Sequence, residues 1–94
     1  MNTREITVGR SKDCDIYLDP NCKYASSHHA VIYYDGRQLM FRDTSTNGTM
    51  INNQRIHQRA VPIRRGDIIM LAGQYQLNWN QIDYYFPPQQ ASPY

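Results

Sequence analysis

The sequence lacks the features that mark several large classes of protein. No run of apolar residues approaches the roughly 18 that a helix needs to cross a bilayer. Its only cysteines, Cys14 and Cys22, form no CxxC pair, so their spacing indicates neither a zinc site nor a framework of disulfides. The four residues after Met1 are polar, and no apolar stretch typical of a signal peptide follows them. These absences argue against a membrane-spanning protein and against a secreted, disulfide-rich one.

Cellular location is inferred from the same absences. We expect both cysteines to be reduced and the chain to be cytoplasmic, either by itself or as the cytosolic part of a longer or membrane-anchored protein. The alternative is a secreted domain in which one disulfide joins Cys14 to Cys22.

Excess charge of either sign is also lacking. Ten Lys and Arg residues face eight Asp and Glu residues, which leaves a net charge of +2. A field this weak does not by itself predict binding to nucleic acid or to a membrane surface. The arginines are scattered among predicted loops and form no basic stripe with interleaved aromatic residues. We therefore expect no nucleic-acid partner and no direct membrane contact.

Helical periodicity is absent too, and short stretches of alternating apolar residues take its place. Turn-forming residues separate these stretches at intervals of about 8–12 residues, as in β-sandwiches and barrels. Asp35-Gly36, between two apolar runs, is a strong signal for a β-hairpin. The sequence thus predicts an all-β sandwich of two antiparallel sheets. The stretches expected to form strands include residues 6–8, 16–18, 29–34, 39–41, 50–51, 68–71, 75–79 and 83–86.

The composition changes after Phe86, where proline and glutamine become frequent. We predict one domain over residues 1–86 and a disordered tail or linker over residues 87–94. Such a tail suggests that the chain is a piece of a longer protein.

Three polar clusters fall in the predicted turns: Gly9-Arg10-Ser11, Ser26-Ser27-His28-His29 and Thr44–Thr49. A phosphate group needs several donors that converge on one point. An arginine offers a charge-assisted fork, a serine offers a hydroxyl, and the N–H groups of a tight loop add more. Hydrogen bonds to charged groups contribute about 1.5–3 kcal/mol each, so two or three would separate a phosphorylated peptide from an unphosphorylated one.

The order and spacing of these clusters resemble the forkhead-associated (FHA) domain family. The arginine of a G-R pair is followed sixteen residues later by the serine of an S-x-x-H, and the asparagine of an N-G-T follows eighteen residues after the histidine. Gly66-Asp67 before an apolar stretch is also similar to that family, and the likeness spans roughly residues 6–79. The resemblance implies a small, non-catalytic β-sandwich that binds phosphothreonine on a partner protein.

The resemblance also implies which residues contact the ligand. Arg10, Ser26 and Ser27 would contact the phosphate, and Thr46 would lie beside them. Asn47 would hold the backbone of the bound peptide, for which an amide that both donates and accepts is well suited. These five residues are the predicted phosphopeptide-binding site.

Three further residues are implied to support the site. His29 would brace the loops, while Gly9 and Gly48 would allow backbone shapes that a Cβ atom forbids. The sequence departs from the family pattern at Ser27, where arginine is common, and this change removes one possible phosphate contact. It also has Asn53 where glycine is common, but asparagine tolerates a positive φ, so the turn should persist.

The N-terminus departs most from the family. Two strands usually precede the G-R strand, but only eight residues precede Gly9 here, so two strands cannot fit. We expect a sandwich that lacks one or two N-terminal strands. Its open sheet edge would be covered by the tail or by another chain, including a second copy in a homo-oligomer.

Other chemistries find less support in the sequence. His28 and His29 would point to opposite faces of a strand and so rarely share an ion, and we predict no metal site and no cofactor. Ser26 and His29 lack a G-x-S-x-G elbow and an orienting acid, so we predict no catalytic residues. The competing hypothesis is a structural or oligomerisation module of the same fold, which binds partners independently of phosphate through a sheet face or an open edge.

Overall fold

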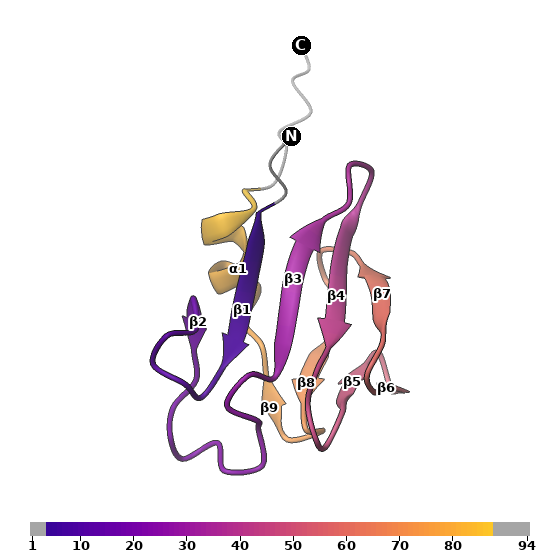
Figure 1. Ribbon diagram of the computed structural model, residues 1–94. Helices are drawn as coiled ribbons and strands as arrows, with labels where there is room; N and C mark the ends of the chain where they lie inside the picture. The colour runs from indigo at the N-terminus through magenta and orange to yellow at the C-terminus, as the bar shows by residue number, and fades with distance from the viewer. Residues whose placement is uncertain (1–3, 88–94) are drawn as a thin grey trace.

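The computed structural model describes residues 4–87, in which two β-sheets pack face to face and a short helix lies beside them (Figure 1). One sheet has the strand order β2-β1-β3-β4-β7 and the other has the order β6-β5-β8-β9. The elements are β1 Glu5–Gly9, β2 Ile16–Tyr17, β3 Ala30–Tyr34, β4 Leu39–Asp43, β5 Thr49–Ile51, β6 Gln54–Ile56, β7 Ala60–Ile63, β8 Ile69–Leu71, β9 Tyr75–Gln76 and α1 Trp79–Tyr85. The predicted sandwich is confirmed.

The sheets are mostly antiparallel, and the exception is β2, which runs parallel to β1. The three strands β1, β3 and β4 form the middle of the larger sheet, and their register places Ile6, Ile32 and Phe41 side by side. All three face the space between the sheets, as the alternation along each strand predicts. The buried core comprises Ile6, Val8, Ile16, Ala30, Ile32, Phe41, Ile51, Ile56, Ile63, Ile69, Leu71, Leu77 and Ile82.

Two turns form as the sequence predicts. Residues 35–38 connect β3 to β4, with Gly36 at φ +100° and the Asp35 carboxylate accepting backbone N–H bonds from Arg37 and Gln38. Asn52 and Asn53 connect β5 to β6 at φ 50° and 70°. Asparagine therefore replaces glycine in this turn without loss of the hairpin.

The prediction for the C-terminal region was wrong. We expected alternating strands over residues 75–79 and 83–86, but β9 ends at Gln76 and α1 spans Trp79–Tyr85. The side chain of Asn78 caps the helix by accepting a hydrogen bond from the N–H of Asn80. Seven residues make only about two turns, which is too short for a helical period to be visible in the sequence. Packing, rather than propensity, selects the helix.

The helix ties the two sheets together on one side of the sandwich (Figure 1). Ile82 is buried in the core, while Trp79 Nε1 donates to the Asp67 carbonyl just before β8. At the other end of the helix, the Tyr85 hydroxyl donates to the Asp15 carbonyl just before β2. These contacts hold α1 against both sheets, and the expectation that the tail or another chain covers an open edge stays a prediction.

No helix among residues 4–87 is long and apolar enough to cross a membrane. The predicted tail over residues 87–94 lies outside the described residues except for Pro87, which follows the end of α1.

The role of α1 can be tested by truncating its buried side chain. Ile82 is 1% exposed, so Ile82→Ala should lower the free energy of unfolding by about 2–5 kcal/mol through lost burial and a residual cavity. Ile68→Ala is the matched control, since Ile68 is 53% exposed and should change stability by about 0.5 kcal/mol or less. Urea denaturation of both variants measures the difference. Equal losses would show that α1 does not complete the core.

Candidate functional site

The three clusters that the sequence singles out lie at one end of the sandwich. The β1–β2 loop, the β2–β3 loop and the β4–β5 loop all emerge at the lower end in Figure 1, since β1 and β4 end there and β3 begins there. Backbone hydrogen bonds join the first two loops: Arg10 N–H donates to the Ser26 carbonyl at 3.2 Å, and Ser11 N–H donates to the Ser27 carbonyl at 3.0 Å. The first two clusters are therefore paired through their backbones.

Gly9 makes this pairing possible. A Cβ atom at Gly9 would lie 2.0 Å from the carbonyl oxygen of Ser27, a distance that no real Cβ contact shows. The residue is required for close approach of two backbones, whereas we expected it to supply an unusual backbone shape. Gly48 does adopt a backbone conformation that a Cβ atom disfavours, as expected, because its φ is +84°.

The Arg10 side chain is held at its inner end. Its Nε–H donates to the Ala25 carbonyl at 2.7 Å, and among residues 4–87 this is the one hydrogen bond that the Arg10 side chain makes. The guanidinium has five N–H donors, so four remain for a ligand. An arginine fixed in this way presents its fork with less loss of conformational freedom on binding.

Ser26 joins the second and third clusters. Its Oγ accepts a hydrogen bond from the backbone N–H of Thr46 at 3.0 Å, twenty residues away in the sequence. Because the oxygen is the acceptor in this bond, the hydroxyl hydrogen is available to donate to a ligand. Thr46 thus comes beside Ser26, as predicted, and does so through its backbone.

His29 is buried, at 0% exposure, between the same two loops. Its Nδ1 accepts the backbone N–H of Ser26 at 3.1 Å, while Nε2 lies 3.1 Å from both the Gly48 carbonyl and Thr49 Oγ1. An N–H at Ser26 can only donate, so Nδ1 must be unprotonated and Nε2 must carry the hydrogen. Burial lowers the pKa of His29 below its ordinary 6.5, against the opposing effects of the Asp43 carboxylate and the Gly48 carbonyl, which favours this neutral form.

A buried carboxylate, which sequence reasoning missed, shapes the β4–β5 loop. Asp43 is 1% exposed and accepts hydrogen bonds from the Ser45 N–H and hydroxyl, the Thr49 hydroxyl and the Gln58 N–H. The Ser45 hydroxyl oxygen in turn accepts the Gly48 N–H at 2.7 Å. An aspartate at a strand end before a run of serine and threonine is typical of such a side-chain-to-backbone turn, and that signal could have identified it.

Asn47 extends from this loop toward the β2–β3 loop. Its Nδ2 donates to the Tyr24 carbonyl at 2.8 Å, and the Asn47 carbonyl lies 3.4 Å from Arg55 Nη2. One of its two amide hydrogens is therefore committed to the protein, while Oδ1 and the second hydrogen remain for a ligand.

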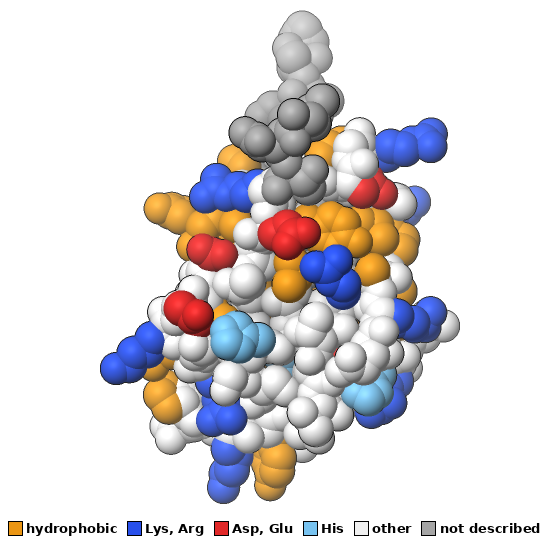
Figure 2. Space-filling model, viewed as in Figure 1, with side chains coloured by type: hydrophobic (Ala, Val, Ile, Leu, Met, Phe, Trp, Pro, Cys, Tyr) orange, Lys and Arg blue, Asp and Glu red, His pale blue; other side chains and the backbone are white. Residues whose placement is uncertain are grey.

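All five predicted binding residues line one surface pocket of about 310 Å³. Lys23 and Tyr24, which the sequence reasoning did not single out, also line it. The charged residues of the lining, Arg10 and Lys23, are both cations. On the face shown in Figure 2, Lys and Arg side chains project from the lower end as they do elsewhere, whereas the visible Asp and Glu side chains all lie higher. The complete lining is Arg10, Lys23, Tyr24, Ala25, Ser26, Ser27, Thr46 and Asn47.

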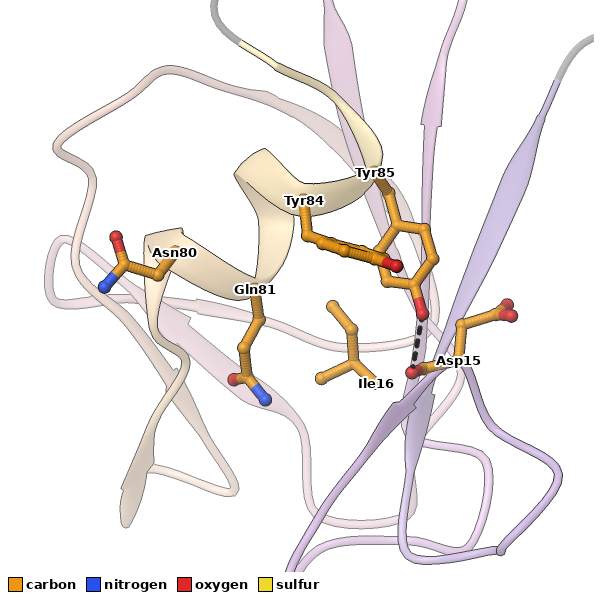
Figure 3. A pocket seen from close by; sticks show the side chains of 6 residues that line it. All are labelled: Asp15, Ile16, Asn80, Gln81, Tyr84 and Tyr85. Atoms are coloured by element: carbon orange, nitrogen blue, oxygen red, sulfur yellow. Dashed lines mark hydrogen bonds between the residues drawn. The ribbon is translucent and has the colours of Figure 1, made fainter.

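A second hollow, of about 330 Å³, lies between α1 and the start of β2 and shares no lining residue with the first pocket (Figure 3). The Tyr85 hydroxyl closes one side of it by donating to the Asp15 carbonyl at 3.0 Å. Its lining has no cation, so it is unsuited to a phosphate, and the candidate site is the polar pocket between the loops. The lining residues are Asp15, Ile16, Asn80, Gln81, Tyr84 and Tyr85.

Comparisons with known proteins agree with the fold. A family model described as "FHA domain" matches residues 6–72. Human "E3 ubiquitin-protein ligase CHFR" is 36% identical over 74 residues, which cover 76% of this chain and 11% of that protein. This chain therefore spans about a tenth of the length of that curated relative.

Solved structures show the same likeness. Mycobacterium tuberculosis EmbR, in complex with a low-affinity phosphopeptide, has a TM-score of 0.65 and 32% identity over 79% of this chain and 20% of the EmbR chain. A structure from a structural and functional study of phosphothreonine-dependent FHA domain interactions has a TM-score of 0.62 and 29% identity, covering 77% of this chain and 72% of the other.

The Asp43 network predicts the effect of an isosteric change. Asp43→Asn would turn an amide N–H₂ toward groups that donate, leaving buried donors unpaired, and should lower the free energy of unfolding by about 1–3 kcal/mol. Asp19→Asn, at an exposed carboxylate, is the control and should cost about 0.5 kcal/mol or less. Urea denaturation measures both. If the two variants lose the same stability, the network does not organise the loop.

The lowered pKa of His29 predicts a pH dependence of stability. Below pH 6.5 the unfolded chain takes up a proton at this residue that the folded chain does not, so the free energy of unfolding should fall as the pH decreases from there. Urea denaturation between about pH 5 and pH 8 measures the slope. His29→Gln, which cannot titrate, should have a smaller slope than the wild type. A wild-type slope no larger than that of the variant would rule out a neutral, buried imidazole.

Proposed function

The chain belongs to the FHA domain family, and on that premise we propose that it binds partner proteins phosphorylated on threonine, through the pocket between its three loops. The observation that carries the proposal is the convergence of Arg10, Ser26, Ser27, Thr46 and Asn47 on that pocket, from loops up to 37 residues apart in the sequence. The pocket is polar and its charged lining is cationic, which suits a dianionic phosphate.

Arg10 and Ser26 are proposed as the main phosphate ligands. The four guanidinium N–H groups of Arg10 beyond Nε and the hydroxyl hydrogen of Ser26 are donors without another assigned partner among residues 4–87. The Ser27 side chain and the Thr46 loop lie beside them and would add further donors. Lys23 would contribute positive charge at the rim, as a point charge rather than a fork.

Asn47 is proposed to hold the peptide backbone. Its Nδ2 is anchored to the Tyr24 carbonyl, which fixes the amide plane and leaves Oδ1 to accept an N–H from the residue beside the phosphothreonine. The side-chain amide of Asn47 would thus act as a strand's peptide group does, donating one hydrogen bond and accepting another.

The described chain is proposed to recognise rather than to catalyse. A serine nucleophile would need a base within reach of its hydroxyl, yet both nitrogens of His29 are engaged, and Nδ1 binds the Ser26 backbone N–H instead of its Oγ. The ligase named among the relatives matches this chain over 11% of its length. We therefore propose that this segment supplies phosphopeptide binding to a larger protein.

Titration with matched peptides tests the proposal. A library of phosphothreonine peptides should bind the wild type, and the same sequences without phosphate should not. Arg10→Ala should weaken the selected peptide about tenfold to a hundredfold, since a charge-assisted hydrogen bond contributes about 1.5–3 kcal/mol. Arg37→Ala, in the β3–β4 turn at the other end of the sandwich, is the matched control and should leave the affinity unchanged.

Two results would contradict the proposal. One is equal binding of phosphorylated and unphosphorylated peptides, which would favour a phosphate-independent assembly module. The other is an equal loss of affinity in Arg10→Ala and Arg37→Ala, which would place the phosphate outside the pocket. Ser26→Ala should behave as Arg10→Ala does, with its stability checked separately because Ser26 Oγ also accepts from Thr46.

A further inference from the structure

Side chains of three types that can ligate metals gather where the β1–β2 and β2–β3 loops meet. Asp13 and Cys14 come from the β1–β2 loop and His28 comes from the β2–β3 loop. One ligand atom from each lies within 4.8 Å of the others. Asp13 Oδ1 and His28 Nε2 are 3.3 Å apart. The cluster therefore combines a carboxylate, a thiol and an imidazole, and none of the three residues lines the polar pocket.

We propose that Asp13, Cys14 and His28 form a binding site for a divalent transition metal, with zinc as the best match. Zinc takes sulfur, nitrogen and carboxylate oxygen in the same coordination shell, and sites with three protein ligands complete it with a water molecule. A thiolate together with an imidazole selects against magnesium and calcium, which prefer oxygen ligands alone.

The distances suit a tetrahedral ion. Zinc bonds of about 2.0 Å to nitrogen and oxygen and about 2.3 Å to sulfur place neighbouring ligand atoms about 3.3–3.6 Å apart. The 3.3 Å between Asp13 Oδ1 and His28 Nε2 already equals such an edge. The Cys14 sulfur lies within 4.8 Å of both atoms, so the ligands would need to approach it by at most about 1.5 Å, which rotation of the exposed Asp13 and His28 side chains can supply.

The surroundings orient the ligands. The Ser11 hydroxyl donates to Asp13 Oδ1, and an outer contact of this kind holds a metal-binding carboxylate in place. Cys14 is 6% exposed, with its sulfur 3.3 Å from the Ser27 carbonyl, so the thiol is fixed at the base of the site. As a bare ion pair, Asp13 and His28 would contribute little, because both side chains are more than half exposed.

A metal here would join the two loops that carry Arg10 and Ser26. The ion would add a further connection to the backbone bonds from Arg10 and Ser11 to the Ser26 and Ser27 carbonyls. If the proposed function holds, this link between the loops predicts that zinc strengthens phosphopeptide binding. The peptide should then strengthen zinc binding by the same factor. A metal here would also overturn the sequence-based expectation of no metal, which rested on the cysteine spacing and on the His28–His29 pair and did not consider Asp13, fifteen residues before His28.

Titration of the 94-residue chain with Co²⁺ and Zn²⁺, under a phosphine reductant, tests the site directly. Co²⁺ should bind one equivalent and produce thiolate-to-cobalt charge-transfer absorption, which Zn²⁺ should displace. Asp13→Asn and His28→Gln, both at exposed positions, should weaken binding at least about tenfold. Cys14→Ser should abolish the charge-transfer band. Cys22→Ser and Asp19→Asn are the matched controls and should bind as the wild type does.

The proposal is overturned if Co²⁺ gives no charge-transfer absorption, or if Asp13→Asn and His28→Gln bind the ion as tightly as their controls. The coupling has its own readout, which is the affinity for a phosphothreonine peptide with Zn²⁺ and with a chelator. Unchanged peptide affinity in the presence of bound zinc would refute the coupling. Zinc binding in a chain that binds no phosphopeptide would refute the proposed function and leave the metal site supported.

Discussion

The arrangement of the loops around the candidate site depends on the hydrogen bonds of the His29 imidazole. This ring accepts the Ser26 N–H at Nδ1 and faces the Gly48 carbonyl and the Thr49 hydroxyl with Nε2. One neutral ring thus ties the β2–β3 loop to the β4–β5 loop, with an acceptor on one side and a donor on the other. No other uncharged side chain of this size offers that combination in opposite directions.

Around this contact the site is largely built before a ligand arrives. Asp43 and Ser45 set the shape of the β4–β5 loop, and the Thr46 N–H then meets Ser26 Oγ. Gly9 lets the β1–β2 loop approach closely enough for Arg10 to reach the same pocket. Because these groups are already ordered, a ligand would lose little affinity to their immobilisation.

Sequence patterns identified the parts of this design that are local or repeated. Alternation located the central strands and Asp35-Gly36 located the hairpin, while the resemblance carried by the spaced polar clusters pointed to five residues that line one pocket. The α1 helix was missed because its two turns show no period, and its formation depends on the burial of Ile82 by distant strands. Asp43 was missed although its place at a strand end before Ser45 and Thr49 is a local signal; only its bond from the Gln58 N–H, which comes from another loop, is invisible in the sequence.

The most direct test of the account is the protonation state of the His29 ring, measured by two-bond ¹H–¹⁵N correlation NMR at neutral pH. The account predicts a ring with an unprotonated Nδ1 and a hydrogen on Nε2, and a Ser26 amide whose resonance reports a hydrogen bond to that nitrogen. A ring that carries its hydrogen on Nδ1, or on both nitrogens, could not accept the Ser26 N–H and would contradict the way the loops are joined.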